Sequence, residues 1–202
     1  MAFLRSGLIG DVQLQIQGRG VHLRPPAPAD YAAWAELRNR SRDHLTPWEP
    51  QWSRDELSRS AFRRRLRHYN REMKEDLGYA LFIFRGGDSE LLGGLTLSNV
   101  RRGVTQAVSL GYWTGAPYVR RGVMTEAVAA ATKFVFDELQ LHRIEAACLP
   151  HNQGSVRVLE QNGFQHEGLA RQYLKIDGIW RDHLLYALLS DDPSGIPAGG
   201  RT

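Results

Sequence analysis

The residues with the clearest chemical potential lie where an expected strand runs into an expected helix. The strand ends in Leu110-Gly111-Tyr112-Trp113, and the basic turn Arg120-Arg121-Gly122 precedes a helix expected from Val123 to Leu139. The first amides of a helix lack intrahelical partners, and the helix dipole favours negative charge there. Gly122 lets the backbone approach a phosphate closely, and the two arginines add positive charge. The pattern favours an anion site, although a plain cap on the strand would look the same.

A second segment, Pro150-His151-Asn152-Gln153-Gly154-Ser155, joins a strand expected over Arg143 to Leu149 to a short helix expected over Gly154 to Gln161. The Asn152 side chain is suited to hydrogen-bonding an extended ligand that carries amides. Asparagine is equally an ordinary N-cap, and Gly163 is an ordinary C-cap. From the residues alone, ligand binding and helix capping both remain open.

The framework that positions these segments follows from apolar patterning and turn residues. We expect further strands at Val21–Arg24, Tyr79–Phe84, Leu91–Val100, Val104–Trp113, Phe164–Gly168 and His183–Leu188, and a first helix from Asp30 to about Asn39. The strands from Tyr79 to Trp113 predict an antiparallel meander. Residues Pro47 to Pro50 predict a rigid turn that leaves Trp48 and Glu49 in a fixed, non-helical conformation.

A long amphipathic helix is expected between that turn and the meander, because apolar residues recur every three to five positions from Leu57 to Leu77. Arginines stand among them at Arg59, Arg63, Arg64, Arg65, Arg67 and Arg71. Acidic residues share the segment, so the arginines form either a solvated polar face or a docking surface for phosphates.

Length and composition favour one globular domain: the chain has 202 residues, 42% of them hydrophobic. We divide it into an N-terminal arm at 1–20, a domain at 21–189 and a disordered, proline- and glycine-rich tail at 190–202. Cys148 is the only cysteine and no secretion leader is evident, which predicts a cytoplasmic protein. No stretch suits a membrane span, no metal-ligand set is complete, and the net charge of +4 favours polyanionic partners.

Together the two segments resemble the GNAT superfamily of N-acetyltransferases. Further blocks are similar to its ribosomal-protein-alanine N-acetyltransferases: Pro47-Trp48-Glu49-Pro50, Ser98 to Gly103, His151-Asn152 with Ser155, Gly163-Phe164, Glu167 to Ala170 and Tyr173 to His183. The similarity runs from about Val21 to Leu188. It implies an α/β (α+β) fold with a mixed, mostly antiparallel seven-stranded sheet flanked by helices, and a V-shaped splay between strands 4 and 5.

The resemblance implies that acetyl-CoA binds in this splay. The implied cofactor-binding residues are Leu110, Gly111, Tyr112, Trp113, Val119, Arg120, Arg121, Gly122, Val123, Met124, Thr125, Asn152, Ser155 and Leu159. Backbone amides after Val119 would meet the diphosphate, and Asn152 would bond a pantetheine amide. Val119 replaces the superfamily's glutamine or arginine, which removes a side chain but leaves the backbone amides. Met124 replaces the closing glycine or alanine, so we expect it to add bulk near the phosphates.

Aminolysis of a thioester needs a neutral amine, a stabilised oxyanion and a proton for the departing thiolate. The superfamily's proton-donating tyrosine falls on Leu159, so Ser155, one turn earlier, is the candidate to meet the coenzyme sulfur, with helix capping as its other role. A backbone amide near Leu110 to Tyr112 would meet the oxyanion. Glu49 is the favoured general base, or alternatively a ligand for the acceptor's ammonium group. Its rivals as base are Glu145 and Asp182.

The acceptor class follows from amine ionisation. An α-amino group with a pKa of ~7.8 is about 14% neutral at pH 7, whereas a lysine with a pKa of ~10.4 is about 0.04% neutral. A site without a strong base therefore suits a protein N-terminus. The resemblance implies the N-terminal alanine of the fifth small-subunit ribosomal protein, with contact to a ribosomal particle and no role for DNA or membranes. The alternatives are a small-molecule amine as acceptor, or a ribosome-maturation factor that binds RNA and catalyses weakly.

Overall fold

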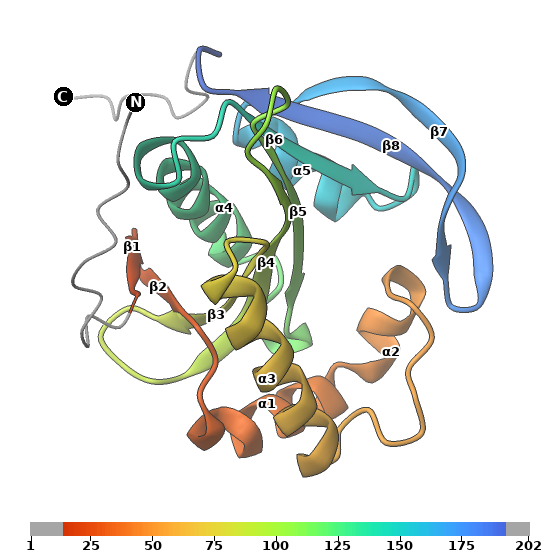
Figure 1. The fold of residues 1–202 in the computed structure, drawn as a ribbon. Helices are drawn as coiled ribbons and strands as arrows, with labels where there is room; N and C mark the ends of the chain where they lie inside the picture. Colours follow the sequence, from red (N-terminus) through yellow and green to blue (C-terminus); the bar gives the residue numbers. More distant parts are fainter. Residues whose placement is uncertain (1–13, 193–202) are drawn as a thin grey trace, which may run out of the picture.

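The computed structural model describes residues 14–192, which form one eight-stranded sheet in the order β1-β2-β3-β4-β5-β6-β8-β7 (Figure 1). The strands are β1 (Ile16–Gly18), β2 (Val21–Arg24), β3 (Tyr79–Arg85), β4 (Leu91–Arg101), β5 (Ala107–Thr114), β6 (Arg143–Cys148), β7 (Gln165–Ile176) and β8 (Ile179–Leu189). Neighbouring strands are antiparallel except β5 and β6, which run parallel. Residues 1–13 of the expected arm and 193–202 of the expected tail lie outside the described residues.

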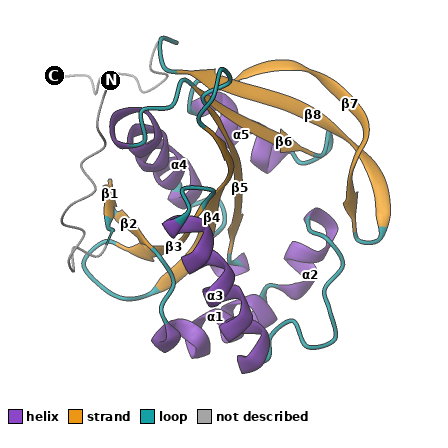
Figure 2. Cartoon of the chain, in the orientation of Figure 1, coloured by secondary structure: helices purple, strands orange, loops and turns teal. Residues whose placement is uncertain are grey.

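Helices cover both faces of this sheet (Figure 2). They are α1 (Tyr31–Arg40), α2 (Arg42–Leu45), α3 (Arg59–Lys74), α4 (Val123–Lys133), which continues as a π-helix over Phe134–Glu138, and α5 (Gln153–Gln161). Short 3₁₀ turns occupy Pro28–Asp30, Thr46–Trp48 and Ala116–Tyr118. Between residues 14 and 192 no helix has both the length and the apolar character needed to cross a membrane.

Side-chain alternation along β3 separates the two halves of the core. Leu81 and Ile83 pack in a cluster with Val128 of α4, whereas Phe82 and Phe84 pack in a second cluster that contains the α3 and α1 side chains. Successive residues of a strand point to opposite faces, so one hydrophobic strand supplies both clusters. The sheet is consequently buried on both sides at its centre.

The V-shaped splay is visible in the strand register. Parallel pairing of β5 with β6 covers only Ala107–Leu110 against Arg143–Ala146. Beyond Leu110, β5 continues to Thr114 beside β4, and β6 continues to Cys148 beside β8. The two strands therefore diverge after Leu110, which confirms the expected opening at this point of the sheet.

The expected mixed, mostly antiparallel sheet is confirmed, with one strand more than the seven expected. The additional strand is β1, which pairs with β2 and falls inside the segment assigned to the arm. The third meander strand begins at Ala107 and not at Val104, because Val104 is fully exposed and Gln106 has a φ of 42°. Residue Trp48 belongs to a 3₁₀ turn, so its expected non-helical conformation is wrong, whereas Glu49 is extended.

The closing strands are much longer than the expected Phe164–Gly168 and His183–Leu188. They form the β7–β8 hairpin, which pairs from Gln165–Ala187 to Ile176–Ile179 with two register shifts. Most β7 side chains are exposed, so its sequence shows no alternation of buried and polar residues. Pairing with β8, rather than burial, makes this segment a strand.

Gly93→Ala should destabilise the fold because β4 and β5 approach closely at this position. A Cβ atom on Gly93 would stand 2.3 Å from the carbonyl oxygen of Trp113, and a backbone atom cannot swing aside. We expect a loss of about 3 kcal/mol in the free energy of unfolding, measured by urea denaturation. Gly103→Ala is the matched control, since a Cβ there meets nothing within 4 Å. Equal stability of the two variants would contradict this packing argument.

Candidate active site

A cavity of about 300 Å³ lies in the splay between β5 and β6, and we call it the wedge cavity. Its lining includes Leu110, Gly111, Tyr112, Asn152, Ser155 and Leu159. These residues come from two segments more than 30 positions apart, and the parallel pairing of β5 with β6 brings them together. The structure thus unites the strand-end residues with the residues that follow the next strand.

Inside the wedge cavity, a tyrosine and a serine form a polar pair. The Tyr112 hydroxyl lies 2.8 Å from Ser155 Oγ. Burial raises the pKa of Tyr112 above its usual range, so the phenol stays protonated and can act as a donor. Cys148, at the end of β6, lines the same cavity, and burial raises the pKa of its thiol. The pair offers a neutral donor chain at physiological pH.

The cap on α5 is made by Asn152, whose Oδ1 accepts a hydrogen bond of 3.1 Å from the Ser155 amide. Capping by Asn152 is therefore confirmed, and its Nδ2 remains available as a donor. The expected alternative role of Ser155 as a cap is not seen, because its hydroxyl contacts Tyr112 instead. Gly163 has a φ of 83°, as a helix C-cap requires.

The turn into α4 has the backbone geometry of an anion site. Gly122 is the N-cap with a φ of 75°, Arg120 has a φ of 59°, and no side chain caps the helix. The amides of Val123 and Thr125, within the first turn, therefore lack intrahelical partners. Arg120 and Arg121 are exposed beside them. This turn fits the diphosphate of a nucleotide-like ligand.

The two residues that depart from the superfamily pattern, Val119 and Met124, differ in where the structure places their side chains. Met124 is 7% exposed and packs in the core cluster beneath α4, so the expectation that it adds bulk near the phosphates is wrong. The backbone at this position turns the side chain inward, leaving the amide side of the turn open. Val119 is half-buried and extended, and it contributes backbone rather than a polar side chain to the turn.

A second cavity of about 440 Å³ lies on the α1 and α3 face of β5, and we call it the acceptor cavity. Pro50, Gly111 and Tyr112 line both cavities, so the acceptor cavity adjoins the wedge cavity at this point of β5. Its lining includes the aromatic residues Trp34, Trp52, Phe62, Tyr69, Phe82 and Trp113. Trp113 therefore faces this cavity with its ring rather than the wedge cavity.

Charged side chains at the wall of the acceptor cavity form a tight ion pair. The buried Arg38 guanidinium donates to both Glu49 oxygens, at 2.6 and 2.7 Å, and Trp52 Nε1 donates to Glu49 Oε2 at 2.9 Å. The Arg38 guanidinium carbon also lies 4.4 Å from the Trp52 ring centroid and 5.0 Å from that of Trp113. Three donors to one carboxylate fix its position and orientation.

The rival carboxylates lie elsewhere. Glu145 pairs with Arg101 and Arg143, and Asp182 Oδ1 accepts a 2.8 Å hydrogen bond from the Gln172 amide. Neither residue lines either cavity. The structure therefore does not bring Glu145 or Asp182 to the junction of the two cavities.

His183 lines the wedge cavity and is 3% exposed, but no sequence pattern assigns it a role of its own. Its Nδ1 lies 3.0 Å from the Arg181 carbonyl oxygen, which only accepts, so the neutral ring carries its proton on Nδ1. Nε2 has no hydrogen-bond partner among residues 14–192. His183 begins the buried half of β8, and its burial is visible only in the structure.

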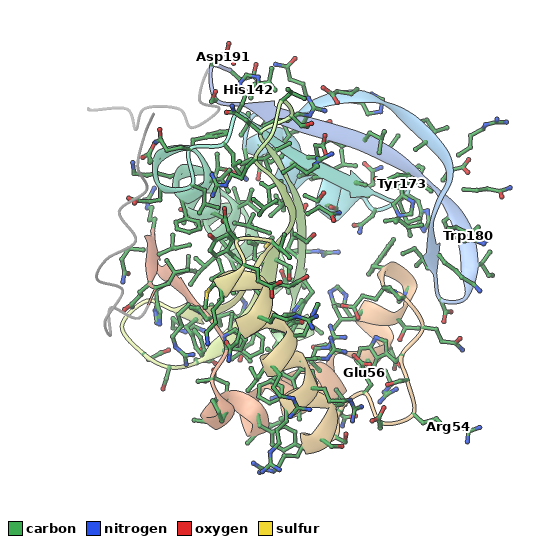
Figure 3. The ribbon with its side chains drawn as sticks, viewed as in Figure 1. Arg54, Glu56, His142, Tyr173, Trp180 and Asp191 are labelled. Atoms are coloured by element: carbon green, nitrogen blue, oxygen red, sulfur yellow. The ribbon has the colours of Figure 1, made fainter. Side chains whose placement is uncertain are left out.

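The β7–β8 hairpin turn contacts the segment after α2 at the cavity mouths. The Asp177 amide donates to the Glu49 carbonyl oxygen at 2.9 Å. Trp48 and His151 rings also pack together, with centroids 5.2 Å apart. Figure 3 labels Tyr173 and Trp180 on the hairpin and Glu56 on the segment that precedes α3. The segment from Trp48 to Pro50 thus borders both cavities, whereas the hairpin borders the wedge cavity.

Comparison with known proteins identifies the class. The family profile described as acetyltransferase (GNAT) domain matches residues 21–165, so the chain belongs to the GNAT acetyltransferases. It is an acyltransferase that uses acetyl-CoA, in agreement with the open turn at α4 and the splayed sheet.

The similar proteins include ribosomal-protein acetyltransferases. The [ribosomal protein uS5]-alanine N-acetyltransferase of Escherichia coli (strain K12) is 37% identical over 165 residues, covering 81% of this chain and 85% of that protein. The crystal structure of ribosomal-protein-S5-alanine acetyltransferase from Vibrio fischeri has a TM-score of 0.82 and 31% identity, covering 89% of this chain and 98% of that one. Mycobacterium smegmatis RimJ in complex with CoA-disulfide has a TM-score of 0.82 and 33% identity, covering 91% and 90%.

Proposed function

We propose that this protein transfers the acetyl group of acetyl-CoA to the N-terminal alanine of ribosomal protein uS5, the fifth protein of the small subunit. The observation that carries the proposal is the junction of the wedge and acceptor cavities at Gly111 and Tyr112. An acyl donor in one cavity and an amine in the other would meet there without a covalent enzyme intermediate. The names of the similar proteins supply the acceptor.

In this proposal acetyl-CoA lies across the splay. The free amides at the start of α4 hold its diphosphate, supported by Arg120 and Arg121. Pantetheine follows β5 past Tyr112, and Asn152 Nδ2 donates to one of its amide oxygens. This arrangement uses the unpaired edge of β5 beyond Leu110, where pairing with β6 has ended.

The neutral α-amine would attack the thioester carbonyl from the acceptor cavity. Backbone amides on the unpaired edge between Leu110 and Tyr112 would donate hydrogen bonds to the developing oxyanion. Ser155 Oγ, backed by the Tyr112 phenol, would give a proton to the departing thiolate, and the proton that the amine loses after its attack would restore the serine hydroxyl. The donor is thus a serine supported from β5, in place of a tyrosine at Leu159.

We assign Glu49 a positioning role rather than that of general base. Both of its oxygens are already hydrogen-bonded to Arg38 and Trp52, so the carboxylate is held in place and is not free to approach the amine. The ion pair with Arg38 instead shapes the acceptor cavity, and the Glu49 carbonyl oxygen holds the hairpin turn. His183 Nε2 is the available proton acceptor on the wedge side.

The test uses two peptides. The first carries the uS5 N-terminus with a free α-amine. The second has the same N-terminal sequence with its α-amine blocked, and it also contains a lysine. We expect mass spectrometry to show one added acetyl group on the free peptide and none on the blocked one. The initial rate should rise about tenfold per pH unit below ~7.8 and level off above it, because only the neutral amine reacts. Glu49→Gln should keep this pH profile. Consumption of spermidine but not of peptide would overturn the assignment.

A further inference from the structure

One face of α3 carries a row of cations that neither cavity uses. Arg59, Arg63, Arg67, Arg71 and Lys74 are all exposed, and we call them the basic stripe. Residues four apart lie on the same side of a helix and about 6 Å apart along its axis, so the stripe is about 22 Å long. The buried residues of α3 are Ala61, Phe62 and Leu66, so the stripe belongs to the exposed part of the helix surface.

The stripe differs from its neighbours in lacking carboxylate partners. Arg64 pairs with Asp55 at 2.5 Å, and Arg65 pairs with Glu56. Within residues 14–192, by contrast, no carboxylate oxygen lies within 4.0 Å of a cation of the stripe; the nearest recorded polar partner is the His68 ring, 3.4 Å from Arg71. The stripe is thus a row of exposed positive charges that no carboxylate among residues 14–192 neutralises at close range.

The kind of partner follows from the shape and chemistry of the stripe. A membrane surface would need the apolar side of α3, but Phe62 and Leu66 are buried in the core, 2% and 7% exposed. A single phosphate would need converging donors, whereas these cations stand in a line. A line of evenly spaced cations matches a polymer whose charges repeat along its length.

We propose that the basic stripe binds the phosphate backbone of double-stranded RNA. The choice of RNA over DNA rests on the proposed function, in which the acceptor is a ribosomal protein. The inward side of the same helix supplies Phe62, Arg65 and Tyr69 to the acceptor cavity. RNA on the outer side and an acceptor N-terminus on the inner side would therefore be held by one rigid element.

The test titrates the full chain into a fluorescent 16-base-pair RNA duplex, with saturating coenzyme A present to occupy the phosphate turn at α4. Arg63→Gln/Arg67→Gln/Arg71→Gln should weaken binding about tenfold or more near 0.1 M salt. It should also lower the slope of log K against log salt by about 3. The matched control removes three exposed cations from other elements: Arg19→Gln/Arg171→Gln/Arg181→Gln.

The outcomes are distinct from those of the acetylation assay, because the stripe variant should acetylate the free uS5 peptide at the normal rate. Equal loss of RNA binding in the stripe and control variants would overturn the proposal, since net charge alone would then explain it. Equal or tighter binding to a DNA duplex or to poly-glutamate would overturn the choice of RNA. Failure of peptide acetylation with intact RNA binding would remove the proposed acceptor and leave the RNA surface standing.

Discussion

Ser155→Ala should lower kcat about a hundredfold and leave the affinity for coenzyme A, measured by calorimetry, nearly unchanged. The Ser155 hydroxyl stands in the wedge cavity with a buried phenol 2.8 Å away, and it makes no structural hydrogen bond as a cap. Loss of a positioned donor to a leaving group typically costs a factor of 10² to 10⁴. The effect should therefore appear in the chemical step and not in binding.

Tyr112→Phe provides the diagnostic comparison. If the phenol acts through Ser155, the double variant Tyr112→Phe/Ser155→Ala should be no slower than Ser155→Ala alone, because both changes interrupt one chain. Ser60→Ala, which removes an exposed hydroxyl from α3, is the control. If the loss of kcat in the double variant equalled the product of the two single losses, Tyr112 and Ser155 would act separately. An unchanged kcat in Ser155→Ala would show that Ser155 takes no part in the reaction.

Gly111→Val should abolish most peptide turnover while preserving the fold and the binding of coenzyme A. A Cβ on Gly111 meets nothing within 4 Å, so β5 itself has room for a side chain. Residues 111 and 113 share a face of β5, and the Trp113 ring lies beside Arg38 on the acceptor side. The valine would therefore narrow the acceptor cavity. We expect kcat/KM for the peptide to fall about a hundredfold through displacement of the amine.

The control for Gly111→Val is Gly103→Val, which also places a side chain in open space but on the turn after β4. Steady-state kinetics on the peptide and calorimetry with coenzyme A distinguish the two cavities. Loss of coenzyme A binding with peptide KM unchanged would mean that position 111 faces the wedge and not the acceptor cavity. Normal kinetics in both variants would mean that the amine does not pass Gly111.

Much of the fold could be predicted because local patterns are strong in it. The apolar runs of β3 and β4 and the glycine before α4 each act over a few residues, and the structure has these elements where the patterns place them. The long β7–β8 hairpin was underestimated, since its exposed residues carry no hydrophobic period and its pairing is between strands. The edge strand β1 lies in the segment assigned to the arm, and its three residues are too few to show a period.

The candidate site also contains local features that the sequence predicts and long-range contacts that it does not. The amide-rich turn at Gly122 and the cap at Asn152 are local, so their residue types are readable in the chain. The pairing of Tyr112 with Ser155 joins residues 43 positions apart, and no spacing rule relates them. The sequence does not show that the Glu49 oxygens accept hydrogen bonds from Arg38 and Trp52, because these contacts form only in the folded chain.

By itself, the sequence determined the class of this protein: strand, glycine turn and helix in one order, with the asparagine segment after the next strand, define an acetyltransferase of the GNAT family. Only the tertiary structure decided that the Tyr112 hydroxyl contacts that of Ser155, that the Glu49 carboxylate is already hydrogen-bonded, and where the two cavities adjoin. Backbone amides and caps depend on neighbours in the chain, whereas side-chain partners depend on the divergence of β5 from β6, a property of the whole sheet.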